Sequence, residues 1–326
     1  MKAVLQQQPG GRETLFIGEI EAPAIKPSEV LVRVHASALN RADILQREGK
    51  YPPPPGASEL MGLEAAGEIY DTGDEVPAEW QAGDLVMCLL AGGGHAEQVA
   101  VDYRLLMRIP NRLTLEQAAA LPEVFLTAYQ TLFWEADARK GETVLIHAGA
   151  SGVGTAAIQL AKAKGLTVVV TASKGKHQIC LDLGADLAID YKEEDFVEKV
   201  KAFTGGIGAH IILDFIGAPY LQKNLEVLAV EGRLIQIAMM GGAKSEINLM
   251  PILAKRLQIK GTTLRARSLT YKQELIEAFK ADFMKAVDAG DIRPYIDTVY
   301  NLEDIRDAHA HMEANRNVGK IVLEVQ

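Results

Sequence analysis

Hydrophobic and β-branched residues, interrupted by polar positions, predict β-strands over the first third of the chain. The segments with this pattern are 30–36 (VLVRVHA), 62–69 (GLEAAGEI) and 85–90 (LVMCLL). Tyr51 is followed by Pro52–Pro55, and such a run is extended because proline fixes φ and removes the backbone donor. Together with the glycines at 92–94, this pattern predicts a small, irregular β-barrel with long loops.

From Pro110 onwards the pattern changes to helices and then to an alternation of strands and helices. Helices are expected over 114–120 and 122–134, the first with Thr114 as N-cap and Gln117 in the capping-box position. Short apolar strands follow at 143–147, 167–171, 188–190, 211–215, 234–238 and 259–263. Helical segments between them predict an α/β fold with a parallel, doubly wound sheet. The last fifty residues are expected to be helical, with a closing strand over 320–325.

Composition narrows the class of protein. A length of 326 residues suggests two domains, and 48% hydrophobic with 24% charged residues is ordinary for a soluble globular protein. The net charge of −9 argues against nucleic-acid binding, which needs a basic face. The two cysteines cannot build a disulfide framework or a cysteine-rich metal site. Without a signal-peptide core or a membrane-length apolar run, the sequence predicts a cytoplasmic protein with no membrane partner.

The segment 149–154 (GASGVG) is the strongest candidate for cofactor binding. It follows the strand TVLIH and opens a helix, which is the context that a dinucleotide fingerprint requires. Its small residues allow a tight turn and a close approach of the backbone to a diphosphate, and the helix N-terminus offers N–H groups to it. Ser151 stands where the strict pattern has its second glycine, and the alternative is an ordinary glycine-rich turn.

The end of the second strand of this unit indicates which nicotinamide cofactor is bound. NAD-binding folds usually place an Asp or Glu there for the ribose hydroxyls. This chain instead continues as Thr171-Ala172-Ser173-Lys174-Gly175-Lys176, with hydroxyl and ammonium groups that suit a 2′-phosphate. The sequence therefore favours NADPH, although both lysines could be ordinary solvated charges.

The chain resembles the zinc-free quinone oxidoreductase branch of the medium-chain dehydrogenase/reductase superfamily. The matching segments are 36–58 (ASALNRADILQREGKYPPPPGAS), GLEAAGEI, 123–132 (EVFLTAYQTL), VLIHAGASGVGTAAIQLAK and LGADLAIDY. The ALNRAD and YPPPPGAS stretches are more similar to the tumour-suppressor-inducible quinone oxidoreductases than to the zeta-crystallins. The resemblance implies a GroES-like catalytic domain (1–121 and 268–326), a Rossmann NADPH-binding domain (122–267) and a homodimer.

The resemblance also implies particular site residues. Those near the nicotinamide are Tyr51 and Thr127, and those at the diphosphate are Ser151, Gly152, Val153 and Gly154. Those at the adenine and 2′-phosphate are Ser173, Lys176 and Tyr191, with Lys174 as an alternative to Ser173 because this loop is one residue shorter than is common. Further contacts on the nicotinamide side are Ile216 with Gly217, Met239, Met240, Leu264 and Arg265.

Zinc chemistry is not expected. Zinc-dependent members of the superfamily read Gly-His-Glu where this chain has Gly62-Leu63-Glu64, and their first cysteine ligand falls at Asn40. Leucine cannot ligate zinc, and two cysteines cannot form the four-cysteine structural site. Among the other candidate side chains, Cys88 is expected in the core and His147 in a local hydrogen bond. His95 is expected in a turn, and His309 and His311 on the surface.

The expected reaction is NADPH-dependent reduction of a quinone. The cofactor carries the reducing chemistry, so the protein has to orient the acceptor and stabilise the oxygen that becomes anionic. Asn40 and Tyr51 are the candidate donors to that oxygen, and Tyr51 could equally be a packing residue. The alternatives are reduction of an activated C=C bond on the same scaffold and nucleotide binding without turnover.

Overall fold

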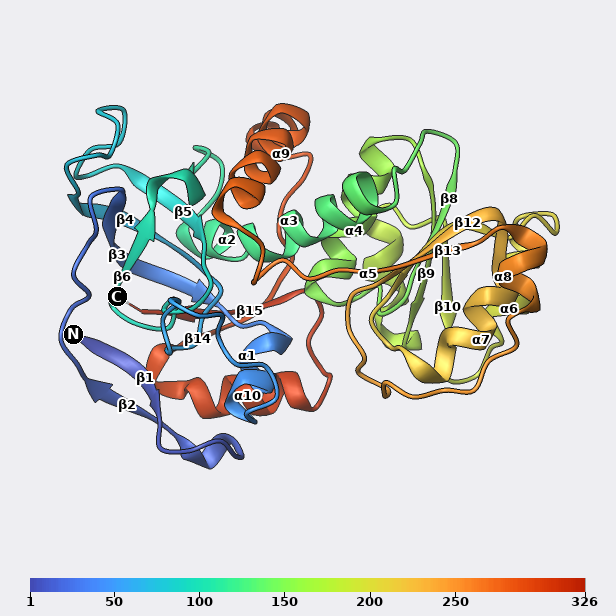
Figure 1. Ribbon diagram of the computed structural model, residues 1–326, viewed down its shortest axis with the longest axis horizontal. Helices are drawn as coiled ribbons and strands as arrows, with labels where there is room; N and C mark the ends of the chain where they lie inside the picture. Colours follow the sequence, from blue (N-terminus) through green and yellow to red (C-terminus); the bar gives the residue numbers. More distant parts are fainter. Residues whose placement is uncertain (326) are drawn as a thin grey trace. The chain divides into compact units, whose positions relative to one another are not determined.

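The computed structural model describes residues 1–325 and divides into two compact units (Figure 1). The first, here called the barrel unit, contains Met1–Leu126 together with the chain from Leu264 onwards. The second, here called the Rossmann unit, contains Thr127–Thr263. No helix within the described residues is long and apolar enough to cross a membrane.

The barrel unit is built on a seven-stranded, mainly antiparallel sheet to which both ends of the chain contribute. Its order is β14-β15-β3-β4-β5-β7, and β6 also pairs with β3. The strands are β3 (Glu29–Ala38), β4 (Glu64–Thr72), β5 (Leu85–Leu89), β6 (Gln98–Asp102), β7 (Leu106–Arg108), β14 (Ile296–Asn301) and β15 (Lys320–Glu324). The C-terminal β15 pairs with β3 in the register Val322↔Ala38, which brings distant parts of the sequence into one sheet. A separate antiparallel pair is formed by β1 (Lys2–Gln6) and β2 (Leu15–Glu19).

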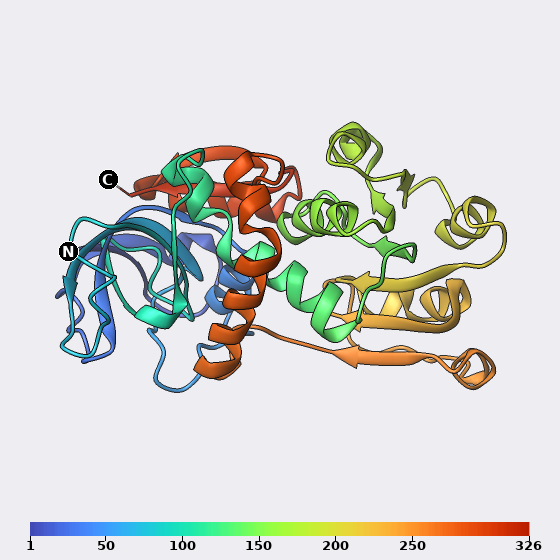
Figure 2. The same cartoon turned by 90° about the horizontal axis from the view of Figure 1, so that it is seen from above.

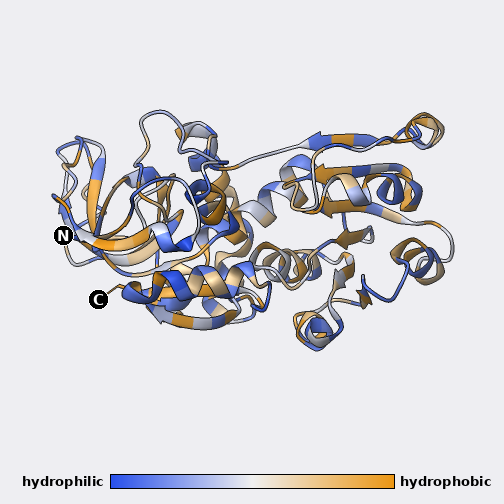
Figure 3. Ribbon diagram, turned by 90° about the horizontal axis from the view of Figure 1, so that it is seen from below, coloured by the Kyte–Doolittle hydropathy of each residue, from blue (hydrophilic) through white to orange (hydrophobic). Residues whose placement is uncertain are grey.

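Four helices belong wholly to the barrel unit: α1 (Arg41–Arg47), α2 (Leu115–Ala119), α9 (Leu269–Ala289) and α10 (Ile305–Glu313). The predicted N-cap of α2 is confirmed, because Thr114 and Gln117 form a reciprocal capping box. The helix expected over 122–134 is α3 (Pro122–Tyr129) continued by a π-helical stretch, Gln130–Glu135. Figure 3 shows that hydrophobic residues are concentrated on the strands, whereas the helices carry both kinds of residue.

The Rossmann unit contains a six-stranded sheet in which every pairing is parallel. The order is β10-β9-β8-β11-β12-β13, with β8 (Thr143–Ile146), β9 (Thr167–Ala172), β10 (Leu187–Asp190), β11 (Ala209–Asp214), β12 (Leu228–Gln236) and β13 (Gln258–Gly261). The helices are α4 (Gly152–Ala163), α5 (His177–Asp182), α6 (Phe196–Phe203), α7 (Ala218–Val227) and α8 (Met250–Lys255), and they lie on both faces of the sheet (Figures 1 and 2). The strand order reverses between β8 and β11, where doubly wound folds bind ligands at the carboxyl ends.

The α/β class and the barrel-plus-Rossmann architecture expected from the sequence are confirmed. Two expectations about strands are wrong: the last fifty residues contain β14 as well as helices and the closing strand, and β12 begins at Leu228 and not at 234. Its pairing with β11 shifts register between Leu228 and Arg233, and Glu231 has a φ of 61°. This irregular stretch, which includes Gly232, hides the alternation that a strand prediction relies on.

His95 lies in a bend of the chain, as expected, but the bend carries its side chain into the core. It is fully buried, its Nδ1 lies 2.9 Å from the Ser37 hydroxyl, and its Nε2 lies 3.6 Å from a carboxylate oxygen of Asp43. The glycines before it let the chain turn inward, because Gly62 and Gly94 approach each other too closely for a side chain at Gly62. Cys88 is buried in β5, as expected.

The expectation that His309 lies on the surface is wrong. His309 is fully buried, and its Nδ1 lies 3.1 Å from the guanidinium of Arg47, which is itself 1% exposed. Its neighbour His311 is half-buried and contacts the Tyr300 hydroxyl at 3.1 Å. The buried residues of α10 follow a spacing of three and four and include His309: Ile305, Ala308, His309 and Met312. This apolar stripe was readable in the sequence and should have taken precedence over the ordinary preference of histidine for the surface.

Candidate functional site

The loop between β8 and α4 forms a cradle for an anionic group. Ala148 turns the chain with a φ of 51°, which residues with a side chain rarely adopt. A Cβ on Gly154 would lie 2.5 Å from the carbonyl oxygens of Ala148 and Gly149, so only glycine allows this approach of helix to loop. Ser151 caps the helix, and its Oγ accepts a hydrogen bond from the Gly154 N–H at 3.1 Å. The predicted diphosphate residues thus lie together at a helix N-terminus: Ser151, Gly152, Val153 and Gly154.

The residues predicted for the adenine end lie at the carboxyl ends of the two adjacent strands. Ser173 follows β9 directly, and Lys174–Lys176 form a single 3-10 turn that leads into α5. The His177 ring Nε2 donates to the carbonyl oxygen of Ala172 at 3.0 Å and holds this turn against the strand. Tyr191 follows β10 and is 45% exposed. Hydroxyl, ammonium and phenol groups therefore gather beyond the strand ends, where a carboxylate would favour NAD.

The residues predicted for the nicotinamide side follow the next two strands of the sheet. Ile216 and Gly217 come after β11, and their N–H groups both donate to the Asp214 carboxylate, at 2.6 and 3.2 Å. Met239 and Met240 come after β12 and are about half exposed. Thr127 is buried in α3, and its carbonyl oxygen accepts from the Thr131 hydroxyl at 2.8 Å. The structure thus brings Ile216, Gly217, Met239 and Met240 to one end of the parallel strands.

In the barrel unit, the side chain of Asn40 is held by three partners. Its amide nitrogen donates to the Glu64 carboxylate at 2.9 Å and to the carbonyl oxygen of Ala38 at 3.2 Å. Its amide oxygen accepts from the Lys320 ammonium at 2.7 Å. Because both amide N–H groups already have acceptors, a new acceptor oxygen would have to compete with a buried carboxylate. This geometry favours Tyr51 over Asn40 as a donor to substrate.

Tyr51 is packed beneath Arg265, whose guanidinium carbon lies 5.3 Å from the centre of the phenol ring. Arg265 is 3% exposed and joins three segments: it donates to the carbonyl oxygens of Tyr51 and Ala91 and to the Gln46 side chain, at 3.2, 2.8 and 2.7 Å. Burial, assisted by the nearby Glu123, raises the pKa of Tyr51. The phenol therefore keeps its proton at neutral pH and remains a hydrogen-bond donor.

A cluster of buried charges lies behind Asn40, and the sequence analysis missed it. Glu64 is fully buried in β4 and forms an ion pair of 2.7 Å with Lys320 of β15. Its second carboxylate oxygen accepts from the backbone N–H of Glu123 at 2.9 Å. Lys272 lies close by and donates to the carbonyl oxygen of Arg265 at 2.7 Å. The available signal was Glu64 between Leu63 and Ala65-Ala66 in the segment GLEAAGEI, since an acid among small and apolar residues of a strand needs a partner.

Glu123 is the member of this cluster whose carboxyl group is not fully hydrogen-bonded. It keeps some exposed surface, but its Oε2 is buried and accepts no hydrogen bond from any described residue. Burial, together with the adjacent Glu64 carboxylate, raises the pKa of Glu123 to about 8, against the opposing effect of Lys320 and Lys272. At neutral pH the carboxyl group therefore holds its proton.

We expect Glu123→Gln to change how stability depends on pH. The carboxyl group has a pKa of about 8 in the folded protein and about 4.5 in the unfolded chain. Its proton therefore stabilises the fold fully below pH about 4.5, and this stabilisation is lost as the pH rises through about 8. Glutamine has no proton to lose, so the variant should gain on the wild type by about 1–2 kcal/mol between pH 6 and 9, a range reduced for the partial exposure. Urea unfolding at several pH values measures this. The exposed Glu198→Gln is the control, and parallel curves for Glu123→Gln and wild type would contradict the assignment.

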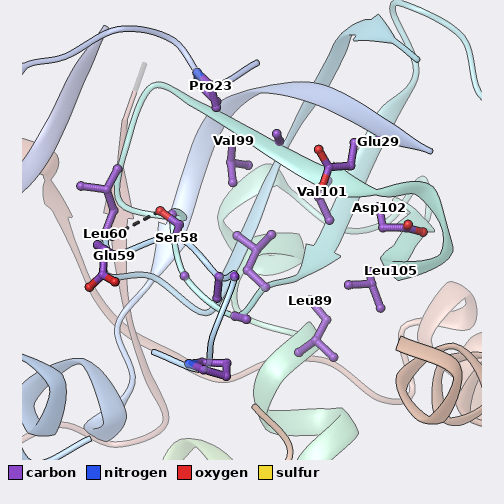
Figure 4. A pocket seen from close by; sticks show the side chains of 18 of the residues that line it. Pro23, Glu29, Ser58, Glu59, Leu60, Leu89, Val99, Val101, Asp102 and Leu105 are labelled. Atoms are coloured by element: carbon purple, nitrogen blue, oxygen red, sulfur yellow. Dashed lines mark hydrogen bonds between the residues drawn. The ribbon is translucent and has the colours of Figure 1, made fainter. Parts of the chain in front are cut away.

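A cavity of about 720 Å³ opens on the barrel unit. Figure 4 shows its apolar wall, which includes Leu89, Val99 and Val101, and its acidic rim, which includes Glu29 and Asp102. Both acids have partners, since Glu29 pairs with Lys26 and Asp102 with Arg104. Arg265 also lines the cavity, but Tyr51 and Asn40 do not.

Within residues 1–325, no three His, Cys, Asp or Glu side chains are placed so that they could hold a metal ion together. At the two positions singled out above, Asn40 is bound to Glu64 and Lys320, and Leu63 is a buried core residue. The Lys320 ammonium supplies the positive charge that balances the Glu64 carboxylate.

Comparison with known proteins agrees with this architecture. Two family models match the chain: the GroES-like domain of alcohol dehydrogenases over residues 26–111, and the zinc-binding dehydrogenase model over residues 152–281. Quinone oxidoreductase of Rattus norvegicus is 32% identical over 327 residues, covering 99% of this chain and 97% of the relative. The synaptic vesicle membrane protein VAT-1 homolog of Danio rerio is 33% identical over 321 residues, covering 93% of this chain and 66% of that protein.

A solved structure extends the similarity to three dimensions. Escherichia coli quinone oxidoreductase, crystallised in complex with NADPH, superposes with a TM-score of 0.89 at 29% identity and full coverage of both chains. That protein thus pairs the same architecture with a nicotinamide cofactor.

Proposed function

Since the chain belongs to the quinone oxidoreductase branch of the medium-chain dehydrogenase/reductase superfamily, we propose that it reduces quinones with NADPH and without zinc. The observation that carries the proposal lies in the Rossmann unit. A glycine cradle at the start of α4 lies next to a strand end that offers Ser173, Lys174 and Lys176 in place of a carboxylate. A diphosphate fits the cradle, and a 2′-phosphate fits the lysines.

Each part of the cofactor has a set of residues to hold it. The N–H groups at the start of α4 would bind the diphosphate, and Lys176 with Ser173 or Lys174 would bind the 2′-phosphate. Ile216, Met239 and Met240 would flank the nicotinamide end. When bound, NADPH supplies a hydride to the acceptor.

The protein's own contribution to reduction is to orient the acceptor and stabilise its charge. As a quinone oxygen gains negative charge, Tyr51 donates a hydrogen bond to it from its phenol. The phenol suits this role because, like an ordinary tyrosine, it is protonated at neutral pH, and because Arg265 fixes the segment that carries it. Asn40 is the second candidate donor. The hydride supplies one of the two hydrogens that the quinone gains, and one proton from water supplies the other, so no essential general acid is required.

The activity itself is tested by NADPH oxidation with a panel of quinones and enones. We expect turnover with quinones, and NADH should be a poorer donor. Preferential turnover of enones would favour a C=C reductase on the same scaffold. NADPH binding without turnover of any acceptor would favour a nucleotide-binding role.

Replacing Tyr51 by Phe should lower the rate of quinone reduction and leave NADPH affinity near normal. The expected loss in kcat is about tenfold, because one hydrogen bond to a charged oxygen is worth roughly 1.5–3 kcal/mol and water replaces part of it. Steady-state kinetics and NADPH fluorescence titration measure the two effects. A neutral Tyr51→Phe combined with a slow Tyr51→Ala would show that the ring only packs.

Catalysis should not depend on a metal ion. We expect elemental analysis of the purified enzyme to find no stoichiometric zinc, and incubation with a chelator to leave the rate unchanged. The reason is that Leu63 cannot ligate zinc and that Asn40 is already bound to Glu64 and Lys320. A rate that falls with chelator and recovers with zinc would overturn this part of the proposal.

The proposed assembly is a homodimer joined through the edge of the Rossmann sheet. β13 is the terminal strand of that sheet, and all four of its residues are exposed. An uncovered strand edge can pair with a second copy. Sedimentation at micromolar concentration should therefore show a dimer.

A further inference from the structure

A chain of hydrogen bonds lies buried beneath the cofactor end of the Rossmann sheet. The Thr171 hydroxyl lies 3.0 Å from the His147 Nδ1, and the His147 Nε2 lies 2.7 Å from the side-chain oxygen of Asn224. The Asn224 amide nitrogen donates to the Asp214 carboxylate at 3.0 Å. All four side chains are at most 1% exposed.

The chemistry of the groups fixes the direction of every bond. A carboxylate only accepts, so the Asn224 nitrogen faces Asp214 and the Asn224 oxygen faces His147. His147 must therefore donate from Nε2, which leaves Nδ1 as an acceptor for the Thr171 hydroxyl. Burial lowers the pKa of His147, so the ring is neutral and needs one proton, at Nε2. The side chains of Tyr220 and Phe196 pack edge-on against the ring, with centroid distances of 4.8 and 4.9 Å.

The four residues of this hydrogen-bond chain lie where three of the proposed cofactor loops begin or are anchored. His147 directly follows β8 and precedes the glycine loop, while Thr171 lies in β9, two residues before Ser173. Asp214 ends β11, and its other carboxylate oxygen accepts from the N–H groups of Ile216 and Gly217. Asn224 comes from α7, the helix that Gly217 begins with a φ of 86°. A single hydrogen-bonded chain thus joins the glycine loop, the Ser173 loop and the Ile216–Gly217 loop.

We propose that Asn224 and His147 are positioning residues, which hold the Ile216–Gly217 loop in register with the other two loops for the nicotinamide half of the cofactor. This inference rests on the proposed role of Ile216 in NADPH binding. An apolar substitute could fill the space, but it would leave the Asp214 carboxylate one donor short. The two loop N–H groups and the carboxylate could then adopt other arrangements.

The test uses Asn224→Leu, with Gln222→Leu on the same helix as the control, because Gln222 bonds to Glu226 and Asn248 and stands outside the chain. Binding of NADPH is compared with binding of 2′,5′-ADP, which lacks the nicotinamide half. Asn224→Leu should lower the affinity for NADPH about tenfold and the affinity for 2′,5′-ADP by less than about threefold. Equal losses for both ligands, or no loss, would overturn the proposal, and Gln222→Leu should change neither.

Conservative substitutions give a second test that survives poor folding of Asn224→Leu. His147→Gln keeps a donor toward Asn224 and should retain most of the NADPH affinity, whereas His147→Leu should behave like Asn224→Leu. Equal NADPH affinities of the two His147 variants would contradict a positioning role for this hydrogen-bond chain.

A third measurement needs no cofactor and separates this inference from the proposed function. In the free wild-type protein, nitrogen NMR should show His147 as the Nε2–H tautomer, and hydrogen exchange at Gly217 should be slow and should accelerate in Asn224→Leu. An Nδ1–H tautomer of His147, or an unchanged exchange rate at Gly217 in the variant, would overturn the proposed hydrogen-bond chain. If the wild-type protein bound no nicotinamide nucleotide, the proposed function would fail. The hydrogen exchange at Gly217 would still decide whether the hydrogen-bond chain holds the Ile216–Gly217 loop.

Discussion

Lys320→Met should destabilise the protein by about 3–5 kcal/mol, the largest loss we expect from any single change. Lys320 is 3% exposed, and its ammonium donates to the carbonyl oxygen of Leu39 and to Asn40 while pairing with Glu64, each at 2.7 Å. Methionine fills a similar volume but carries no charge. The Glu64 carboxylate would then remain buried without its cation, and that uncompensated charge is the source of the cost. Urea unfolding at pH 7 gives the free energy directly.

Two further variants distinguish charge from packing. The double variant Glu64→Gln with Lys320→Met removes both charges and keeps one of the two acceptor oxygens at position 64, so it should recover part of the lost stability. Lys26→Met breaks an exposed pair of similar length with Glu29, in which Lys26 is 73% exposed, and should cost less than about 1 kcal/mol. A double variant as unstable as Lys320→Met would show that the loss comes from packing.

Lys176→Ala should weaken NADPH binding by about 10- to 100-fold and leave NADH binding nearly unchanged. A hydrogen bond to a charged group is worth roughly 1.5–3 kcal/mol, and each 1.4 kcal/mol is a factor of ten in affinity. The lower end of that range applies if water reaches the site. NADH carries no 2′-phosphate and so loses no partner. Titration of both cofactors against wild type and variant measures the selectivity.

Salt and a matched lysine provide the controls for this selectivity. The advantage of NADPH over NADH should shrink as ionic strength rises, because exposed charges are screened. Lys199, on the surface of α6 and paired with Glu194, is remote from the Ser173 loop in sequence, and Lys199→Ala should affect neither cofactor. Equal losses of NADPH and NADH in Lys176→Ala would mean that Lys176 shapes the loop and does not read the phosphate.

Local patterns were sufficient to predict the architecture and the cofactor loop. Alternating strands and helices follow from residue periodicity, and the glycine loop follows from the short segment 149–154, because a turn of this kind needs small residues close together. The capping box at Thr114 was predicted for the same reason, since its two partners are three residues apart. The irregular start of β12 was not predicted, because its bulge interrupts the alternation.

The sequence by itself determined the α/β class, the order of the Rossmann strands along the chain, the glycine cradle and the missing carboxylate after β9. Only the tertiary structure decided which polar residues are buried and with which partners. Asn40 and Lys320 are 280 positions apart, and Arg47 and His309 are 262 apart, yet each pair shares a hydrogen bond. The identity of a histidine or lysine is the same on the surface and in the core. Its burial depends on which distant strand or helix packs over it, and therefore on contacts that no local pattern contains.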